Sequence, residues 1–252
     1  PPEVLQKLRK QQFVVVGAGK TGIDAVLHLL ANGVEQASIK WIAPNDAVMF
    51  DRGAIFFDAE PDMTGIPGRG CLGRGGIPGP FCVLDESVQP QNFRCATVSR
   101  EELAQLRTVK DVVRLGRVVR ASEGTLHLER GTVALDAACL LVDCTGDGLR
   151  HQAATPIFCG DKITLQSVVT CQQVFSAALI AHVECMDQHS EAKKNKMCTP
   201  VPHPLKLADM GTTHAITERN KARFNAEFGE WMSRSRLNFD NHKEKLRGWR
   251  PS

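Results

Sequence analysis

The stretch of the sequence with the clearest chemical potential is VVVGAGKTGID, which runs from Val14 to Asp24. It contains GKT, which is typical of a triphosphate-binding loop, and GAGKTG, which is typical of a dinucleotide-binding turn. A triphosphate loop needs a glycine five residues before the glycine of GKT, because that length of backbone wraps the phosphate chain. That position is Val14, inside an apolar run, so the dinucleotide turn is the better interpretation.

In a dinucleotide turn each glycine has its own task. Gly17 makes the tight turn after a buried strand, Gly19 lets the backbone approach a pyrophosphate, and Gly22 lets the helix pack on the strand. We therefore expect cofactor contacts from the whole turn, Gly17, Ala18, Gly19, Lys20, Thr21 and Gly22.

The elements that must position this turn are readable on both sides of it. Residues 13–16 predict a buried strand, and Ile23, Val26, Leu27 and Leu30 have the spacing of one buried helix face. Asn32-Gly33 is typical of a helix C-terminus. Residues 38–43 predict the second strand, which completes a nucleotide-binding βαβ unit. The alternative is a glycine-rich turn in an α/β domain that binds no nucleotide.

The exit of the second strand bears on which dinucleotide would bind. An acidic residue normally holds the ribose diol of NAD there, but this strand leaves through Ala43-Pro44-Asn45. With Lys40 and Arg52 nearby in the sequence, the expectation favours NADP over NAD, although Asp46 could still reach the ribose. Asn45 and Arg52 are therefore candidate cofactor-binding residues.

The remaining patterns predict an α/β fold, with a Rossmann-like parallel sheet, a small antiparallel β-ribbon and a helical C-terminal tail. Ser99 and Glu102 form a capping box before a helix. Residues 125–128 and 132–135 predict the ribbon, and residues 140–146 predict a buried strand with a tight exit. A helix is expected at 175–184, and the charged tail after it has sparse apolar residues, so we expect it to lie across a neighbour and not in a core.

Composition narrows the function classes. The 252 residues are 42% hydrophobic, which indicates a globular protein, and the net charge of +3 is spread along the chain, which favours neither nucleic acid nor a membrane surface as partner. No apolar run approaches the ~20 residues of a membrane helix. Nine cysteines without a CxxC pair predict reduced thiols and a cytoplasmic protein.

No metal site is expected. His182, Cys185 and His189 could share a helix face, but the two histidines would lie about 10 Å apart along its axis, too far to hold one ion. The segment 65–80, which holds GIPG twice, is too rich in glycine for a packed element and predicts a loop. The chain begins with Pro1, which suggests a piece of a longer protein.

The glycine turn, the ribbon and the strand that ends in Asp143-Cys144-Thr145-Gly146 together resemble the nicotinamide half of flavin-containing monooxygenases and the related pyridine nucleotide-disulfide oxidoreductases. The phrases that carry the resemblance cover most of the chain outside 65–80, and are GAGKTGID, FRCATVSREEL, DCTGDGL, GDKITLQ, CQQVFSAALIAHVE and PVPHP.

The resemblance implies FAD as a second cofactor, an NAD(P)-binding domain over residues 1–142, and a return segment of the flavin domain with a helical tail over 143–252. Thr145 and Gly146 match the family's return strand, and Gly160 and Asp161 are similar to a flavin-facing Gly-Asp, although Gly-Asp is also a common turn. The family's first fingerprint, for FAD, is absent from this sequence. We therefore expect a chain that is incomplete for turnover and that self-associates or pairs with an N-terminal FAD half. Without that half, the return segment lacks its partner sheet, so we expect apolar residues such as Leu140, Val142 and Ile157 to be poorly covered.

In this chemistry the cofactors react and the protein orients them. No catalytic residue can be assigned, since Ser176 lacks a GxSxG context and His203 lies between prolines. Two functions remain: an FAD- and NAD(P)H-dependent oxidoreductase, monooxygenase-like and acting on a small molecule that no motif identifies, or a dinucleotide-binding module without turnover that regulates or binds other proteins.

Overall fold

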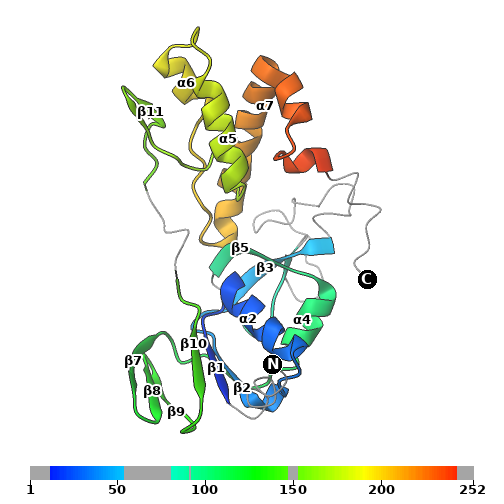
Figure 1. Cartoon of the computed structure of the whole chain (residues 1–252), viewed down its shortest axis with the longest axis vertical. Helices are drawn as coiled ribbons and strands as arrows, with labels where there is room; N and C mark the ends of the chain where they lie inside the picture. The colour runs from blue at the N-terminus through cyan, green and yellow to red at the C-terminus, as the bar shows by residue number, and fades with distance from the viewer. Residues whose placement is uncertain (1–11, 54–80, 91, 147–152, 243–252) are drawn as a thin grey trace, which may run out of the picture. The chain divides into compact units, whose positions relative to one another are not determined.

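The computed structural model describes residues 12–53, 81–90, 92–146 and 153–242 (Figure 1). They form two compact units: the first three ranges make the N-terminal unit, and the last makes the C-terminal unit. This division keeps residues 143–146, which the sequence analysis placed in the second domain, with the N-terminal unit. The expected loop at 65–80 lies outside the described residues.

The N-terminal unit is built on a four-stranded sheet in which neighbouring strands are parallel. The strand order is β10-β1-β2-β6, with β1 (Phe13–Val16), β2 (Ile39–Ile42), β6 (Val112–Val113) and β10 (Leu140–Asp143). In register, Val16 lies beside Ile42 on one side and Asp143 on the other. The carboxyl ends of β1, β2 and β10 therefore meet at one edge of the sheet.

Helices cover one face of this sheet. Helix α2 (Lys20–Ala31) buries Ile23 and Val26, and α4 (Arg100–Leu106) buries Leu103 and Leu106, in one apolar cluster with the strand residues Phe13, Val15, Ile39 and Trp41. The expected helix end is confirmed, since Asn32 is the C-cap of α2 and Gly33 has a φ of 77°. The capping box is also confirmed: Ser99 Oγ accepts from the Glu102 amide, and the Glu102 carboxylate accepts from the Ser99 amide.

An antiparallel ribbon covers the opposite face. It has three strands, β7 (Val118–Ser122), β8 (Thr125–Leu128) and β9 (Gly131–Ala134). Leu126, Leu128 and Val133 pack with Val14, Val16 and Ile42 in a second apolar cluster. The predicted pairing of residues 125–128 with the strand that follows is confirmed, and β7 extends it by one strand.

A second, smaller sheet completes the N-terminal unit. β3 (Ala47–Asp51) pairs in parallel with β5 (Asn92–Val98) and antiparallel with β4 (Phe81–Cys82). The rings of Phe50, Phe81 and Phe93 pack with centroid distances of 5.0 to 5.7 Å. The described residues therefore form a mixed α/β fold, with one all-parallel sheet, one sheet of mixed pairing, antiparallel strands elsewhere, and helices.

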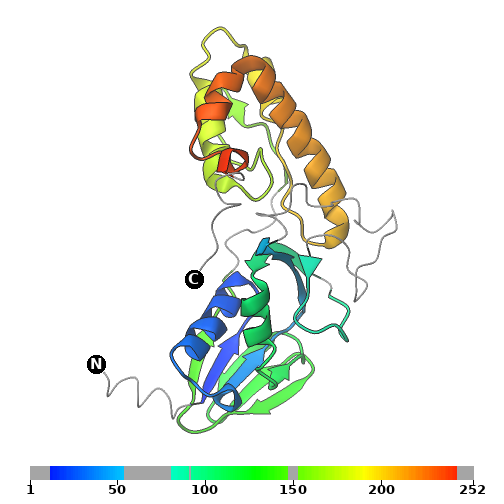
Figure 2. The ribbon, with the colours of Figure 1, turned by 90° about the vertical axis from the view of Figure 1, so that its right-hand side faces the viewer.

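The C-terminal unit is mostly helical. A short hairpin of β11 (Phe158–Cys159) and β12 (Lys162–Ile163) precedes α5 (Gln173–Glu184), α6 (Glu191–Met197) and the long α7 (Met210–Arg234), which Figure 2 draws in orange. Phe175, Leu179 and Val183 of α5 pack with Phe224, Phe228 and Met232 of α7 in one core. None of the described helices is long and apolar enough to cross a membrane.

Two expectations from the sequence are wrong. The tail does not lie outside a core, because Phe224, Phe228 and Met232 of α7 are buried. The strand 140–143 is not buried: β10 is an edge strand of the parallel sheet in the described structure, and Leu140 and Leu141 are 43% and 40% exposed.

Candidate functional site

Two hydrogen bonds join the turn between β1 and α2 to β2, one donated by the turn and one by the strand. The Gly17 amide donates to the Ile42 carbonyl at 2.9 Å, and the buried Trp41 indole Nε1 donates to the Gly17 carbonyl at 2.8 Å. A buried tryptophan needs a partner for its single N–H, and this one fixes the turn. The role of Trp41 was missed from the sequence, where the only available signal was a tryptophan within an apolar strand.

The three glycines differ in how much room their neighbours leave for a side chain. Gly17 has a φ of +116°, and a methyl group there would lie 2.7 Å from the Cys144 carbonyl oxygen. A methyl group on Gly22 would lie 2.0 Å from the Gly17 carbonyl oxygen. At Gly19 such a group would have no heavy atom within 4 Å. Two glycines therefore allow close packing, and the middle one faces open space.

No side chain caps the backbone amides at the start of α2. Gly19 is the N-cap, with extended backbone and no side-chain cap on the first turn. The first amides of a helix have no intrahelical acceptor, and the helix dipole is positive at this end. Ala18 and Lys20 are half-buried and Thr21 is exposed, and Lys20 pairs with Asp24 one turn along the helix.

The end of β10 lies beside this turn. The Cys144 amide donates to the Val16 carbonyl at 2.8 Å, which places Thr145 and Gly146 directly after the sheet edge that carries the glycines. Asp143 Oδ1 accepts from the amide and the hydroxyl of Thr145, at 2.9 and 2.6 Å, and these bonds lower the pKa of Asp143. The structure therefore brings Thr145 and Gly146 to the same edge as Gly17.

Gly160 and Asp161 belong to the C-terminal unit and form the turn between β11 and β12. Gly160 has a φ of 59°, and its amide donates to the Glu191 carboxylate at 2.8 Å. Both residues are exposed. Of the two interpretations open for this pair, the structure shows a hairpin turn.

The residues expected to select the nucleotide are engaged in ion pairs, with one exception. Lys40 pairs with Asp111. Arg52 pairs with Glu102 at 3.0 Å, so it supports the capped start of α4. Asn45 is exposed at the exit of β2.

A charged cluster that the sequence analysis did not find lies at the same exit. Arg114 Nε and Nη2 donate to the two carboxylate oxygens of Asp46, at 2.7 and 3.0 Å, and Nη2 lies 3.3 Å from Asp85 Oδ2. The hydrogen bond and charge of Asp46 raise the pKa of Arg114. The sequence gives no signal for this cluster, because Asp46 and Arg114 are 68 positions apart.

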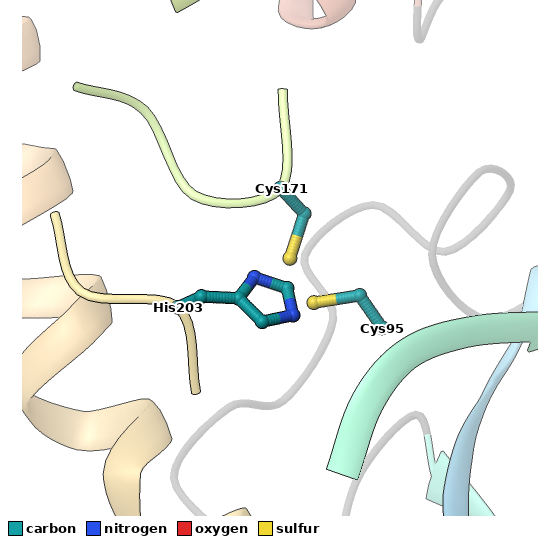
Figure 3. A group of neighbouring side chains, drawn as sticks. All are labelled: Cys95, Cys171 and His203. Carbon is teal, nitrogen blue, oxygen red and sulfur yellow. The ribbon is translucent and has the colours of Figure 1, made fainter. Parts of the chain in front are cut away.

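The C-terminal unit contains a cysteine and a histidine whose side chains point toward each other (Figure 3). Cys171 Sγ and a ring nitrogen of His203 lie within 4.8 Å, and Cys171 has a positive φ of 56°. Cys95, drawn in the same figure, belongs to β5 of the N-terminal unit and also has a positive φ, of 55°. The reduced thiols expected from the sequence are present at six of the described cysteines, Cys82, Cys139, Cys144, Cys159, Cys185 and Cys198, and not at Cys95 and Cys171.

Comparison with known proteins finds relatives in mycobacteria. The chain is 39% identical over 254 residues to the uncharacterized protein Rv2000 of Mycobacterium tuberculosis, and equally to the uncharacterized protein Mb2023 of Mycobacterium bovis. Each alignment covers 94% of this chain but 47% of the relative, so the chain spans about half the length of the curated relatives it matches. No protein-family model and no solved structure matches the chain.

Proposed function

We propose that this chain is the nicotinamide-dinucleotide-binding part of a flavin-dependent oxidoreductase that resembles flavin-containing monooxygenases. The observation that carries the proposal is the difference in surroundings among the three glycines. Gly17 and Gly22 sit where a methyl group would meet backbone at 2.7 and 2.0 Å, while Gly19 faces open space. A pyrophosphate needs this combination, a tight turn with room for close approach at its middle glycine.

The order of the strands supports a Rossmann-like interpretation of the sheet. Along the chain the parallel strands are β1, β2, β6 and β10, so the spatial order β6-β2-β1-β10 is third, second, first, fourth. Dinucleotide-binding sheets begin with this order and bind their ligand where it reverses, beyond the carboxyl ends of the first and fourth strands. Gly17 follows the first strand there, and Thr145 and Gly146 follow the fourth.

The proposed roles follow from these positions. The amides of the turn and of the first turn of α2 hold the pyrophosphate, and the dipole of α2 adds to the attraction. Thr145 and Gly146 border the nicotinamide side of the dinucleotide. The reduced nicotinamide of NADH or NADPH would supply the hydride that reduces the flavin. The flavin itself, FAD by the resemblance, is held by a part of the longer protein that corresponds to the unmatched half of the relatives.

The substitution Gly19→Val tests the nucleotide site. Because no heavy atom lies within 4 Å of the position and the backbone is extended, the side chain fits the free protein. It fills the space that a pyrophosphate would use, so we expect calorimetric binding of NADH and NADPH to be lost while the melting temperature stays within a few degrees. Gly211→Ala, a helical glycine with equally open surroundings in the other unit, is the matched control. Equal nucleotide affinity in wild type and Gly19→Val would contradict the proposal.

A second measurement distinguishes a chain that is incomplete for turnover from a complete enzyme. With excess FAD and NADPH in air, we expect weak flavin retention and little NADPH consumption by the chain. Stoichiometric bound flavin with sustained consumption would instead identify a complete enzyme. Nucleotide binding without turnover, even after the partner half of a longer relative is supplied, would favour the non-catalytic module.

A further inference from the structure

The exit of β2 and the end of β6 are joined, and this fixes where the charged cluster lies relative to the glycine turn. The Gly17 amide donates to the Ile42 carbonyl, and the next amide along β2, that of Ala43, donates to the Val113 carbonyl at 2.9 Å. Arg114 follows Val113 directly. In a dinucleotide site the adenosine ribose lies over the carboxyl end of the second strand. The ribose would therefore meet the segment that carries Asp46 and Arg114.

Arg114 is held in a fixed orientation by two carboxylates. Asp46 accepts both Nε and Nη2 in a forked pair, and its side chain is 5% exposed. Asp85 Oδ2 lies 3.3 Å from Nη2 of Arg114. The side chains of Asp85 and Arg114 are 36% and 29% exposed. Forked arginine–carboxylate pairs are the strongest and most directional of the charged hydrogen bonds. The guanidinium group is thus already paired with carboxylates of the protein.

The charge of this end of the site follows directly. One guanidinium between two carboxylates leaves a net charge of about −1, by formal charges. The two other cations that the sequence places near the strand exit are also neutralised, Lys40 by Asp111 and Arg52 by Glu102. A 2′-phosphate carries up to two negative charges and needs a cation with a free face. A ribose diol is neutral and needs only hydrogen-bond partners.

We infer that the Asp46–Arg114–Asp85 cluster makes this site select NAD(H) over NADP(H), the reverse of the preference expected from the sequence. The inference rests on the proposed function and names the specificity-determining residues of that same site. Residue types alone favoured a phosphate partner for Lys40 and Arg52, but the structure pairs both with carboxylates. We expect the wild-type chain to bind NADH at least about tenfold more tightly than NADPH at low salt, because like charges a few ångströms apart in a partly exposed site repel by that order.

The space beside the cluster is large enough for part of a nucleotide. A cavity of about 390 Å³ runs along β6, with Asp85 and Arg114 in its lining. Its other charged lining residues are Glu86, Arg107 and Lys110, of which Arg107 is tied to Glu86 at 3.0 Å. Small-molecule sites begin at roughly 300 Å³. Lys110 precedes β6 and its Nζ donates to the Arg107 carbonyl at 2.8 Å, whereas Arg114 follows the strand.

The test compares dissociation constants for NADH and NADPH, measured by calorimetry on the whole chain. Asp85→Asn removes the half-exposed carboxylate and leaves the Asp46–Arg114 pair in place. We expect NADPH affinity to rise about tenfold while NADH affinity stays within twofold. Glu86→Gln is the matched control, because it removes the same charge from the lining of the same cavity beside Arg107, and it should leave the ratio of the two constants unchanged. On the wild type, raising the salt from 50 to 300 mM should narrow the NADH preference.

The outcomes separate this inference from the function on which it rests. If the wild type binds NADPH as tightly as NADH, or if Asp85→Asn leaves the ratio unchanged in a chain with wild-type circular dichroism, the inference is wrong and the dinucleotide site stands. If the wild type binds neither nucleotide, the proposed function fails and the inference fails with it. A salt-independent preference would also overturn the electrostatic account.

Discussion

The packing of α2 on β1 predicts a large difference between two glycine substitutions only three positions apart. In Gly22→Ala the new methyl group lies 2.0 Å from the Gly17 carbonyl oxygen and 2.9 Å from the Gly17 carbonyl carbon. Both contacts are with backbone, which cannot rotate away. In Gly19→Ala the new methyl group meets no heavy atom within 4 Å.

The magnitudes follow from opposing terms. Alanine is favoured over glycine inside a helix by about 1 kcal/mol, which would stabilise Gly22→Ala if it had room. Relief of the clash requires α2 to move away from the turn by about 1 Å, and overpacking of a well-packed site costs typically 1–3 kcal/mol and occasionally more. The net loss in unfolding free energy should be about 2 kcal/mol. For Gly19→Ala, at the N-cap, we expect a loss of about 0.5–1 kcal/mol, because glycine is better tolerated there than alanine.

Urea unfolding, followed by both circular dichroism and tryptophan fluorescence, measures the difference. Trp41 donates its indole N–H to the Gly17 carbonyl, so a displaced turn should also change the emission of the folded Gly22→Ala protein. Gly211→Ala is the control, since its helical position is open and its unfolding free energy should stay equal or rise by up to about 1 kcal/mol. If Gly22→Ala proves as stable as Gly19→Ala, with unchanged fluorescence, the close approach of α2 to the turn is refuted.

Two further predictions concern the C-terminal unit. The fully buried Asn220 donates to the Val168 and Thr199 carbonyls at 3.0 and 2.6 Å, so Asn220→Ala should lower the unfolding free energy by about 2–4 kcal/mol, against almost no change for the exposed Asn45→Ala; a loss below about 1 kcal/mol in urea unfolding would contradict this. Burial raises the pKa of the Cys198 thiol to about 12. The protonated thiol is therefore compatible with folding below pH 9, and the unfolding free energy should fall as the pH rises from 9 toward 12, because the unfolded thiol ionises first. At pH 8.5 iodoacetamide should modify the exposed Cys159 and Cys185 well before Cys198, and equal rates by mass spectrometry would show that Cys198 is accessible.

Local signals predicted the elements around the glycine turn correctly because they act over a few residues. The strand 13–16, the C-cap at Asn32 and the capping box at Ser99 each depend on neighbours within one or two helical turns. The position of a strand within its sheet depends on residues that are distant in the sequence. An apolar run such as residues 140–143 has the same pattern in the centre of a sheet and at its edge, so the pattern alone predicted a buried strand.

The buried face of α7 was obscured by its polar members. Its large buried apolar residues, Phe224, Phe228 and Met232, lie in the second half, and the long gap between Met210 and Phe224 made the helix look like a surface element. Thr213, Thr217 and Asn220 fill the intervening buried positions. Thr217 accepts the Thr170 amide and Asn220 donates to the Val168 carbonyl, so this stripe satisfies the backbone of the loop before α5. The pattern of hydrophobic residues alone does not identify a core helix when hydrogen-bonded polar residues occupy part of its buried face.

The expected Ile157 exposure fails for a related reason. Next to an expected loose return segment, Ile157 seemed to lack cover, yet it is fully buried in the core of the C-terminal unit with Phe158, Val168 and Val169. The helices that cover it begin more than 15 positions later in the chain. Its burial thus depends on tertiary packing, which residue type alone does not specify.

The selectivity of the proposed site depends on pairing of the same non-local kind. Residue types near the strand exit suggested free cations, because Lys40 and Arg52 carry positive charge. Their net effect depends on Asp111 and Glu102, 71 and 50 positions away, which strand register and helix placement bring to them. A charge that is committed to a carboxylate contributes little toward a phosphate, so the sign of the local field is decided by tertiary contacts. The ratio of NADH to NADPH affinity therefore measures the pairing itself and not the number of basic residues in the strand exit.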